Sequence, residues 1–140
     1  MTEDSLILEI VGPDQSMLEC QVEMVVVPAS EGDIGVLPGH SPLISSLRPG
    51  SVVIFEAGKA TQRFFVSGGF FEVTPTRCKV LANEAYEIDK LDPKHIETKC
   101  SNAKDDLSLA REEKEQEKCQ NNLDIYEKML DAYNNPSYKS

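Results

Sequence analysis

With 140 residues, the chain has room for one domain with a modest core, or for a small domain and an appended arm. Its net charge of −10 at pH 7 argues against nucleic acid or an anionic lipid surface as the direct partner, because both of these bind basic faces. No apolar run approaches the roughly 20 residues that span a bilayer, so we expect no direct membrane insertion and any membrane link to pass through another protein. The acidic first residues are unlike a basic leader, so the protein is expected to stay where it is made.

The first half of the chain is predicted to be a run of short strands. Residues 5–11 are apolar except for Glu9, and residues 18–26 alternate so that Leu18, Cys20, Val22, Met24 and Val26 share one face. Further strands are predicted at residues 51–55, 62–67, 70–74 and 77–82. Turn residues at intervals of about 8 to 12 positions indicate an antiparallel sandwich or barrel that continues through Tyr86.

Three details of this half concern its turns and surfaces. Pro28 is expected to end the second strand, because proline lacks the N–H that a strand ladder uses. The segment Arg48-Pro49-Gly50-Ser51 has Pro and Gly at the positions that suit a type II turn, which predicts a hairpin at this point. Val25, Val27 and Leu81 are apolar where alternation points outward, so they either cover other elements of this chain or form a patch for a partner.

Residues 30–43, reading SEGDIGVLPGHSPL, combine three glycines and two prolines with the apolar pair Val36 and Leu37. A solvated linker has no need of apolar side chains, so a structured loop with a fixed path is predicted. Gly32, Gly35 and Gly39 permit positive φ where the chain turns, while the prolines lock φ. The shape of this loop is therefore expected to be set by its backbone.

From residue 94 to residue 134 the chain contains no glycine or proline and is predicted to be helical. Asp92-Pro93 is a typical helix start, and Asn134-Asn135-Pro136 is a typical stop. Two apolar stripes recur at helical spacing but do not join in register, which places the reversal of an antiparallel helical hairpin near residues 108–113. A single long helix remains an alternative, because no glycine or proline marks the reversal. The stripes are Ile96, Cys100, Ala103, Leu107 and Ala110, and Cys119, Leu123, Tyr126, Leu130 and Tyr133.

Three motifs in order carry a resemblance to a known family. They are residues 31–43 (EGDIGVLPGHSPL), residues 47–50 (LRPG) and residues 67–73 (SGGFFEV). Together they resemble the epsilon subunit of bacterial and chloroplast F-type ATP synthases, strongly from Leu6 to about Asp92 and only by pattern beyond. The resemblance and the residue patterns agree on a β-sandwich domain at residues 1–86 and a helical hairpin domain at residues 87–140, with a hinge at residues 87–90.

The resemblance implies a non-catalytic subunit of the central stalk that couples the gamma shaft to the c-ring during proton-driven ATP synthesis. The gamma subunit and the c-ring are the implied partners, and the alpha and beta subunits are further implied partners of the hairpin, through which it would regulate ATP hydrolysis. Residues 112–131 carry more acidic than basic side chains, however, and the resulting repulsion would weaken docking on an acidic segment of the beta subunits. The implied location is peripheral, on the cytoplasmic side of the inner membrane, as part of the F1 sector.

The loop supplies the candidate site residues. Glu31 and Asp33 flank Gly32 and are expected to present negative charge to a polar or basic partner, and in the family the matching loop faces the ring of c subunits. His40 lies in the same loop, and an imidazole bonded to loop backbone explains it better than a general base does. The set predicted to face the c-ring is thus Glu31, Gly32, Asp33 and His40.

Some family members hold ATP through an Asp-x-x-Arg-Ala motif at the start of the first helix. Here the stretch begins at Asp92 and has His95 where those members have arginine, and histidine lacks the charged fork that grips phosphate. Asp92 is thus a weak nucleotide candidate, since a helix cap explains it fully, and no cofactor is predicted.

No catalytic or metal motif is found in the sequence. The four cysteines lack zinc spacing and are expected to be reduced and mostly buried. Two other function classes stay open. A free-standing adaptor or chaperone-like binding module would share this architecture, and an enzyme would need His40 in a pocket with a carboxylate.

Overall fold

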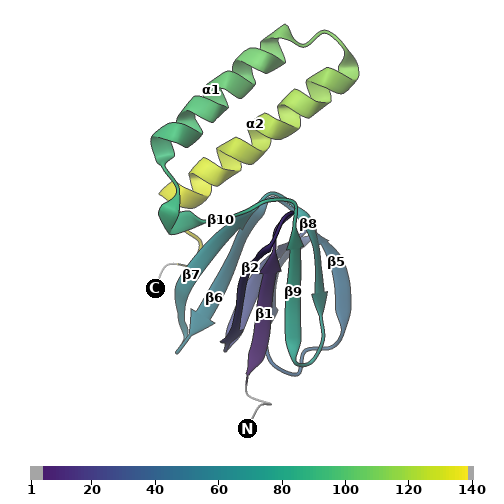
Figure 1. Ribbon diagram of the computed structural model, residues 1–140, viewed down its shortest axis with the longest axis vertical. Helices are drawn as coiled ribbons and strands as arrows, with labels where there is room; N and C mark the ends of the chain where they lie inside the picture. The colour runs from purple at the N-terminus through teal and green to yellow at the C-terminus, as the bar shows by residue number, and fades with distance from the viewer. Residues whose placement is uncertain (1–4, 139–140) are drawn as a thin grey trace.

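The computed structural model describes residues 5–138, and within these residues ten strands precede a helical hairpin (Figure 1). This confirms the predicted fold class. The strands are β1 (Leu6–Val11), β2 (Ser16–Val22), β3 (Met24–Ala29), β4 (Gly32–Val36), β5 (Leu43–Leu47), β6 (Gly50–Glu56), β7 (Lys59–Val66), β8 (Gly69–Val73), β9 (Arg77–Ala82) and β10 (Ala85–Glu87). A 3-10 helix, η2 (Ile88–Lys90), leads into α1 (Pro93–Leu109) and α2 (Glu113–Asn134).

All ten strands belong to one sheet that closes over a core. The order is β10-β7-β6-β3-β5-β8-β9-β1-β2, with β4 paired to β3. The two halves meet at a single pair, Ala29 with Leu47. Every pairing is antiparallel except that of β1 with β9, which is parallel. The predicted antiparallel sandwich therefore contains one parallel pair.

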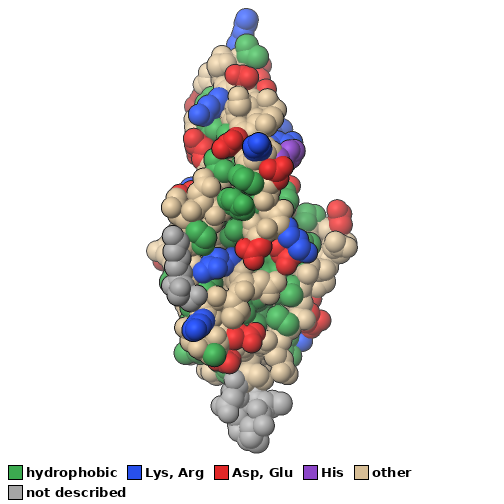
Figure 2. All heavy atoms as spheres, turned by 90° about the vertical axis from the view of Figure 1, so that its left-hand side faces the viewer, with side chains coloured by type: hydrophobic (Ala, Val, Ile, Leu, Met, Phe, Trp, Pro, Cys, Tyr) green, Lys and Arg blue, Asp and Glu red, His purple; other side chains and the backbone are tan. Residues whose placement is uncertain are grey.

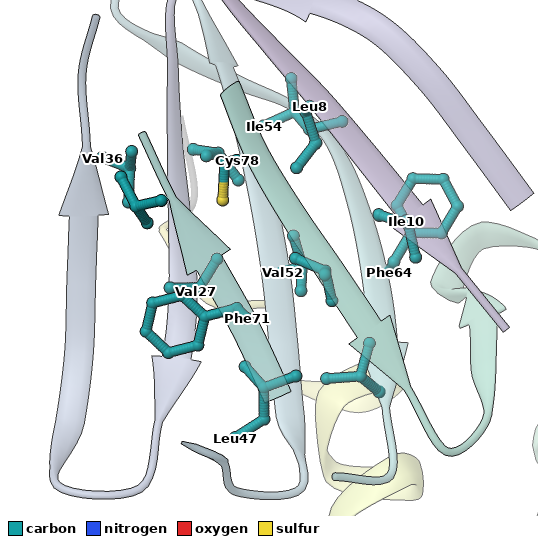
Figure 3. Close-up of a cluster of buried hydrophobic side chains, with 14 of the residues drawn as sticks. Leu8, Ile10, Val27, Val36, Leu47, Val52, Ile54, Phe64, Phe71 and Cys78 are labelled. Carbon is teal, nitrogen blue, oxygen red and sulfur yellow. The ribbon is translucent and has the colours of Figure 1, made fainter. Parts of the chain in front are cut away.

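The core lies between the two halves of the sheet and draws side chains from nearly every strand (Figure 3). Phe64 of β7 and Phe71 of β8 are its largest members and are 2% and 0% exposed. They pack among Leu8, Ile10, Val27, Val36, Leu47, Val52, Ile54 and Cys78, which Figure 3 labels. Close packing of this kind makes the sandwich resistant to deformation.

The predicted strand at residues 18–26 is in fact two strands separated at Glu23. β2 pairs with β1, whereas β3 pairs with β4 and β6. The break shifts the alternation by one residue, so each side chain after it points to the side of the sheet opposite to the one predicted. As a result Val25 and Val27 are core residues with 0% exposure, and the interpretation of these two as a partner patch is wrong.

Pro28 does not end its strand. On one side it lies opposite Asp33 of β4, and on the other its carbonyl accepts the Arg48 N–H at 2.9 Å, so the missing donor is not needed.

The predicted hairpin at residues 48–51 is also absent, because β5 pairs with β3 and β8 while β6 pairs with β3 and β7. Gly50 is not at positive φ but at a close approach, where an added Cβ would lie 2.9 Å from the Pro28 Cβ.

The segment predicted as a loop at residues 30–43 is a strand followed by a short loop. β4 forms a hairpin with β3, and Gly35 lies within this strand rather than at a turn. Gly32 and Gly39 do have positive φ, 143° and 86°, at the two places where the chain turns. The second part of the segment is fixed by the Gly39 N–H, which donates to the Pro75 carbonyl at 2.7 Å.

The helical hairpin begins and ends where the sequence predicts. The Asp92 carboxylate caps α1 by accepting the Lys94 N–H at 3.1 Å, and Pro93 occupies the first turn. The chain reverses between Leu109 and Glu113, so the single long helix is ruled out. A second apolar cluster lies between the helices and the sandwich and includes Phe65 of β7, Ile88 of η2, Ile96, Leu123 and Met129.

Figure 2 shows hydrophobic side chains gathered at the junction of the hairpin and the sandwich. Met129, which neither predicted stripe included, is 5% exposed there. Residues 87–90, the predicted hinge, take part as well, because Ile88 belongs to this apolar cluster and is 3% exposed. Within the same segment, Lys90 forms an ion pair with Glu87 at 2.7 Å. Among residues 5–138, neither helix is long and apolar enough to cross a membrane.

Tyr86, in β10, gives a prediction for alkaline pH. Burial, together with the Glu84 carboxylate that its phenol contacts at 3.2 Å, raises the pKa of Tyr86 to about 12. An unfolded tyrosine titrates near pH ~10. Because the folded pKa is the higher one, the stabilisation is fully present below about pH 10 and is lost as the pH rises toward about 12. Urea unfolding at a series of pH values should show stability falling over this window, and falling less steeply in Tyr86→Phe. An equal slope in both proteins would contradict the assignment.

Candidate partner-binding surfaces

The predicted c-ring-facing residues lie along one edge of the sandwich rather than in one cluster. Within residues 5–138, β4 pairs only with β3 and is an edge strand. Glu31 lies in the turn before it, Asp33 near its start and His40 beyond its end. At about 3.3 Å per residue in a strand, the first and last of these residues are well separated along the edge. We call the stretch 31–40 the β4 edge.

Asp33 is exposed but already partnered. Its carboxylate forms an ion pair with Arg48 and also accepts the phenol O–H of Tyr138 at 2.6 Å. Arg48 in turn donates to the Ala29 carbonyl at 2.6 Å. Glu31 is exposed in the turn and makes no ion pair within residues 5–138, so it is the carboxylate that the β4 edge presents outward.

His40 is bonded to its own loop. Its backbone N–H donates to the Leu37 carbonyl at 3.1 Å, and its Nδ1 lies 2.7 Å from the Ser41 carbonyl oxygen. The structural interpretation of this histidine is therefore confirmed. The expected positive φ of Gly32 also holds, and no atom lies within 4 Å of the position that a Cβ would take there.

A separate apolar patch lies on the outer face of β5, β8 and β9, which are side by side in Figure 1. It consists of Ile44, Phe70 and Leu81, with exposed fractions of 71%, 59% and 44%. Phe70 lies opposite Leu81 across β8 and β9, and Ile44 is its diagonal neighbour on β5. We call these three residues the outer patch. Exposed apolar side chains grouped in this way mark interaction surfaces.

Sequence reasoning found only Leu81 of the outer patch. The signal for a second member was present in the Phe70-Phe71 pair, because neighbouring residues of a strand point to opposite faces and one of two adjacent aromatics must face outward. Ile44 could not be assigned in this way, since its segment was predicted to end in a hairpin that does not form.

The weak nucleotide candidate Asp92 lies at a hollow of about 480 Å³ between the start of α1 and α2. Lys90, His95 and Lys99 also line it, together with Tyr86 and Tyr126. Asp92 is engaged as the cap of α1, and His95, at the place of the family arginine, is exposed.

No cluster of three or more His, Cys, Asp or Glu side chains suited to a metal ion is present in the described part of the chain. All four cysteines are free thiols, two of them buried. Burial raises the pKa of Cys78 to about 12, and it also raises that of Cys20 and of Cys100. Cys20, Cys78 and Cys100 are therefore poor nucleophiles at neutral pH.

Comparison with known proteins gives the family. Residues 5–88 match the family described as "ATP synthase, Delta/Epsilon chain, beta-sandwich domain". The chain is 40% identical to the ATP synthase epsilon chain of Rhodospirillum rubrum over 124 residues, which cover 89% of this chain and 92% of the relative. It is 44% identical to that of Granulibacter bethesdensis over 96 residues, 69% of this chain and 71% of the relative.

The fold agrees with this relationship. A chain in the cryo-EM structure of the Euglena gracilis mitochondrial ATP synthase, described as OSCP/F1/c-ring in rotational state 1, superposes with a TM-score of 0.78 at 24% identity. The match covers 92% of this chain and 81% of the other. On the strength of its sandwich, its hairpin and its relatives, the chain belongs to the epsilon-chain family of ATP synthases.

Proposed function

We propose that this chain is the epsilon subunit of the rotor of an F-type ATP synthase, a non-catalytic part of the central stalk that couples the gamma shaft to the c-ring. The family match and the identity to epsilon chains over most of their length carry this proposal. The Euglena gracilis neighbour was solved in an OSCP/F1/c-ring assembly, and another neighbour in the central stalk and c-ring of the Tetrahymena thermophila mitochondrial ATP synthase. The work is mechanical: a tightly packed sandwich transmits torque because it deforms little under load.

Two surfaces of the sandwich are assigned to two partners under this proposal. The outer patch is the contact for the gamma subunit, because burying apolar side chains against a protein surface gives stable attachment. The β4 edge faces the c-ring, with Glu31 directed toward a polar or basic surface. The protein then lies peripherally on the membrane as part of the F1 sector, on the cytoplasmic side of the inner membrane.

The helical hairpin is proposed to move about the hinge at residues 87–90 as a unit separate from the sandwich. Release would expose the apolar cluster that includes Phe65, Ile88 and Ile96, so it requires compensating contacts elsewhere. Docking on the alpha and beta subunits would have to supply these contacts, and the acidic surface of α2 makes an acidic docking segment unfavourable.

The test of the gamma assignment is a pull-down with Phe70→Asp. An aspartate at this position removes apolar contact and would leave a charge buried in the interface, so the affinity for gamma should fall about 100-fold. The control is Leu109→Asp, which places the same charge on an apolar side chain that is 74% exposed, at the far end of the hairpin. Binding should be measured with purified gamma by surface plasmon resonance, and co-purification should be read from solubilised membranes.

The outcomes separate the two function classes. Normal gamma binding by Phe70→Asp would remove the outer patch from the interface while leaving the subunit assignment intact. If the unmodified chain were purified from solubilised membranes without gamma and the c-ring, the free-standing adaptor would be favoured instead.

A further inference from the structure

The last residues that the structure describes turn back from α2 onto the sandwich. α2 ends at Asn134, and Pro136, Ser137 and Tyr138 follow. The Arg63 side chain, on β7, donates from Nε to the Ser137 carbonyl at 2.8 Å and from Nη2 to the Tyr138 carbonyl at 2.9 Å. After α2, the chain thus returns beside β7. We call residues 136–138 the C-terminal strap.

Tyr138 extends this attachment to two more strands. Its ring packs edge-on against Phe55 of β6, with ring centroids 5.7 Å apart and planes at 74°. Its phenol O–H donates to the Asp33 carboxylate of β4 at 2.6 Å, and Arg48 holds the other oxygen of that carboxylate. One residue therefore combines an aromatic contact with a charge-assisted hydrogen bond, the stronger kind of hydrogen bond.

Tyr138 meets Phe55 on the outer face of the sheet, because Phe55 follows the core residue Ile54 in β6. Val26 of β3 and Val53 of β6 lie opposite each other and alternate with core residues, so they point to the outer side of the sheet. They are nevertheless only 6% and 0% exposed. Burying such residues is favourable in water, and Tyr138 of the strap lies on the same side of the sheet.

The backbone at Tyr138 also indicates that contacts determine its conformation. Its φ is 57°, in the left-handed region that residues other than glycine rarely adopt. Such a conformation persists where surrounding interactions hold it. The contacts made by Arg63, Asp33 and Phe55 are the interactions present here.

We propose that the C-terminal strap is a latch that holds the helical hairpin against the sandwich, with the Tyr138 phenol and the Asp33 carboxylate as its closing contact. The strap follows α2 directly, so fixing it fixes the end of α2 nearest the sandwich. Opening the latch would free that end and let the hairpin undock. This device concerns the isolated chain and does not depend on either partner assignment.

Hydrogen–deuterium exchange of the full-length chain tests the latch. Tyr138→Ala removes both contacts and should speed exchange of the α2 amides at residues 123–134 about tenfold, while Tyr138→Phe keeps the ring and should speed it about threefold. Asp33→Ala removes the carboxylate that accepts the phenol O–H, together with its ion pair to Arg48, and adding Tyr138→Phe to Asp33→Ala should change exchange little, because the shared contact is already gone. Asp14→Asn, an exposed acid in the turn after β1, is the control and should change nothing.

Exchange in β8 and β9 should stay equal in all variants, which verifies that the sandwich remains folded. Faster exchange in α2 for Tyr138→Ala, together with the non-additive pair, supports the latch. Unchanged exchange in α2, with any difference confined to residues after 134, would overturn it and reduce the strap to a locally ordered tail.

Discussion

Gly69→Ala should unfold the sandwich at room temperature. A Cβ at this position would lie 2.0 Å from the Leu81 carbonyl oxygen and 3.1 Å from the Ala82 Cα, and both of these are backbone atoms that no side-chain movement can displace. The φ of Gly69 is 129°, which adds strain for any other residue. Domains of this size have a free energy of unfolding of about 5 to 15 kcal/mol, and forcing β8 away from β9 should remove most of it. Circular dichroism reports whether the sandwich is folded, and urea unfolding measures the free energy of unfolding that is left.

Gly32→Ala is the matched control for this prediction. Gly32 has a φ of 143°, also unfavourable for alanine, but no atom lies within 4 Å of its Cβ position. Gly32→Ala should therefore cost only the backbone strain, about 1 to 3 kcal/mol, and remain folded. Similar losses in both variants would show that strain, and not the close approach to β9, dictates glycine at position 69.

Phe71→Ala should destabilise the protein by about 3 to 5 kcal/mol, the usual cost of removing a buried phenylalanine ring. Phe71 is completely buried and packs in the core between the two halves of the sheet (Figure 3). The cavity left by the ring cannot collapse easily, because residues from several strands line it. Urea unfolding at neutral pH gives the value directly.

The preceding residue provides the contrast. Phe70 points away from the core and is 59% exposed, so Phe70→Ala should change stability by less than about 1 kcal/mol. The same substitution should weaken the attachment to gamma under the proposed function. If Phe70→Ala proved as destabilising as Phe71→Ala, the outer patch would be part of the fold's own packing and no longer a candidate interface.

The sequence predicted the hairpin of helices better than the sheet. Helix boundaries are marked by local chemistry, such as the Asp92 cap with Pro93 and the stop at residues 134–136. The stretch around Glu23 has no such mark. Its neighbours are all apolar, so alternation fits equally well in either register. They are Val22, Met24, Val25, Val26 and Val27. Only the pairing of the two resulting strands with different neighbours decides which face is buried.

The candidate partner-binding surfaces were harder to predict than the sheet, because they depend on contacts between residues distant in sequence. Asp33 was predicted to present its charge to a partner protein, but Arg48 and Tyr138 of this chain both bind it, the latter from 105 positions away. The outer patch likewise joins Ile44 to Phe70 and Leu81 only through the strand order β5-β8-β9. The family resemblance suggested the proposed partners, whereas the arrangement of strands supplied the candidate residues.

The parallel pairing of β1 with β9 has a consequence for synthesis on the ribosome. Ile7 of β1 pairs with Arg77 of β9, so the β1 edge that faces β9 has no partner until more than half of the chain has been made. Joining segments so far apart carries a loop-closure cost and slows folding. The amino-terminal hairpin of β1 and β2 therefore keeps one unpaired strand edge on the ribosome until β9 has been made.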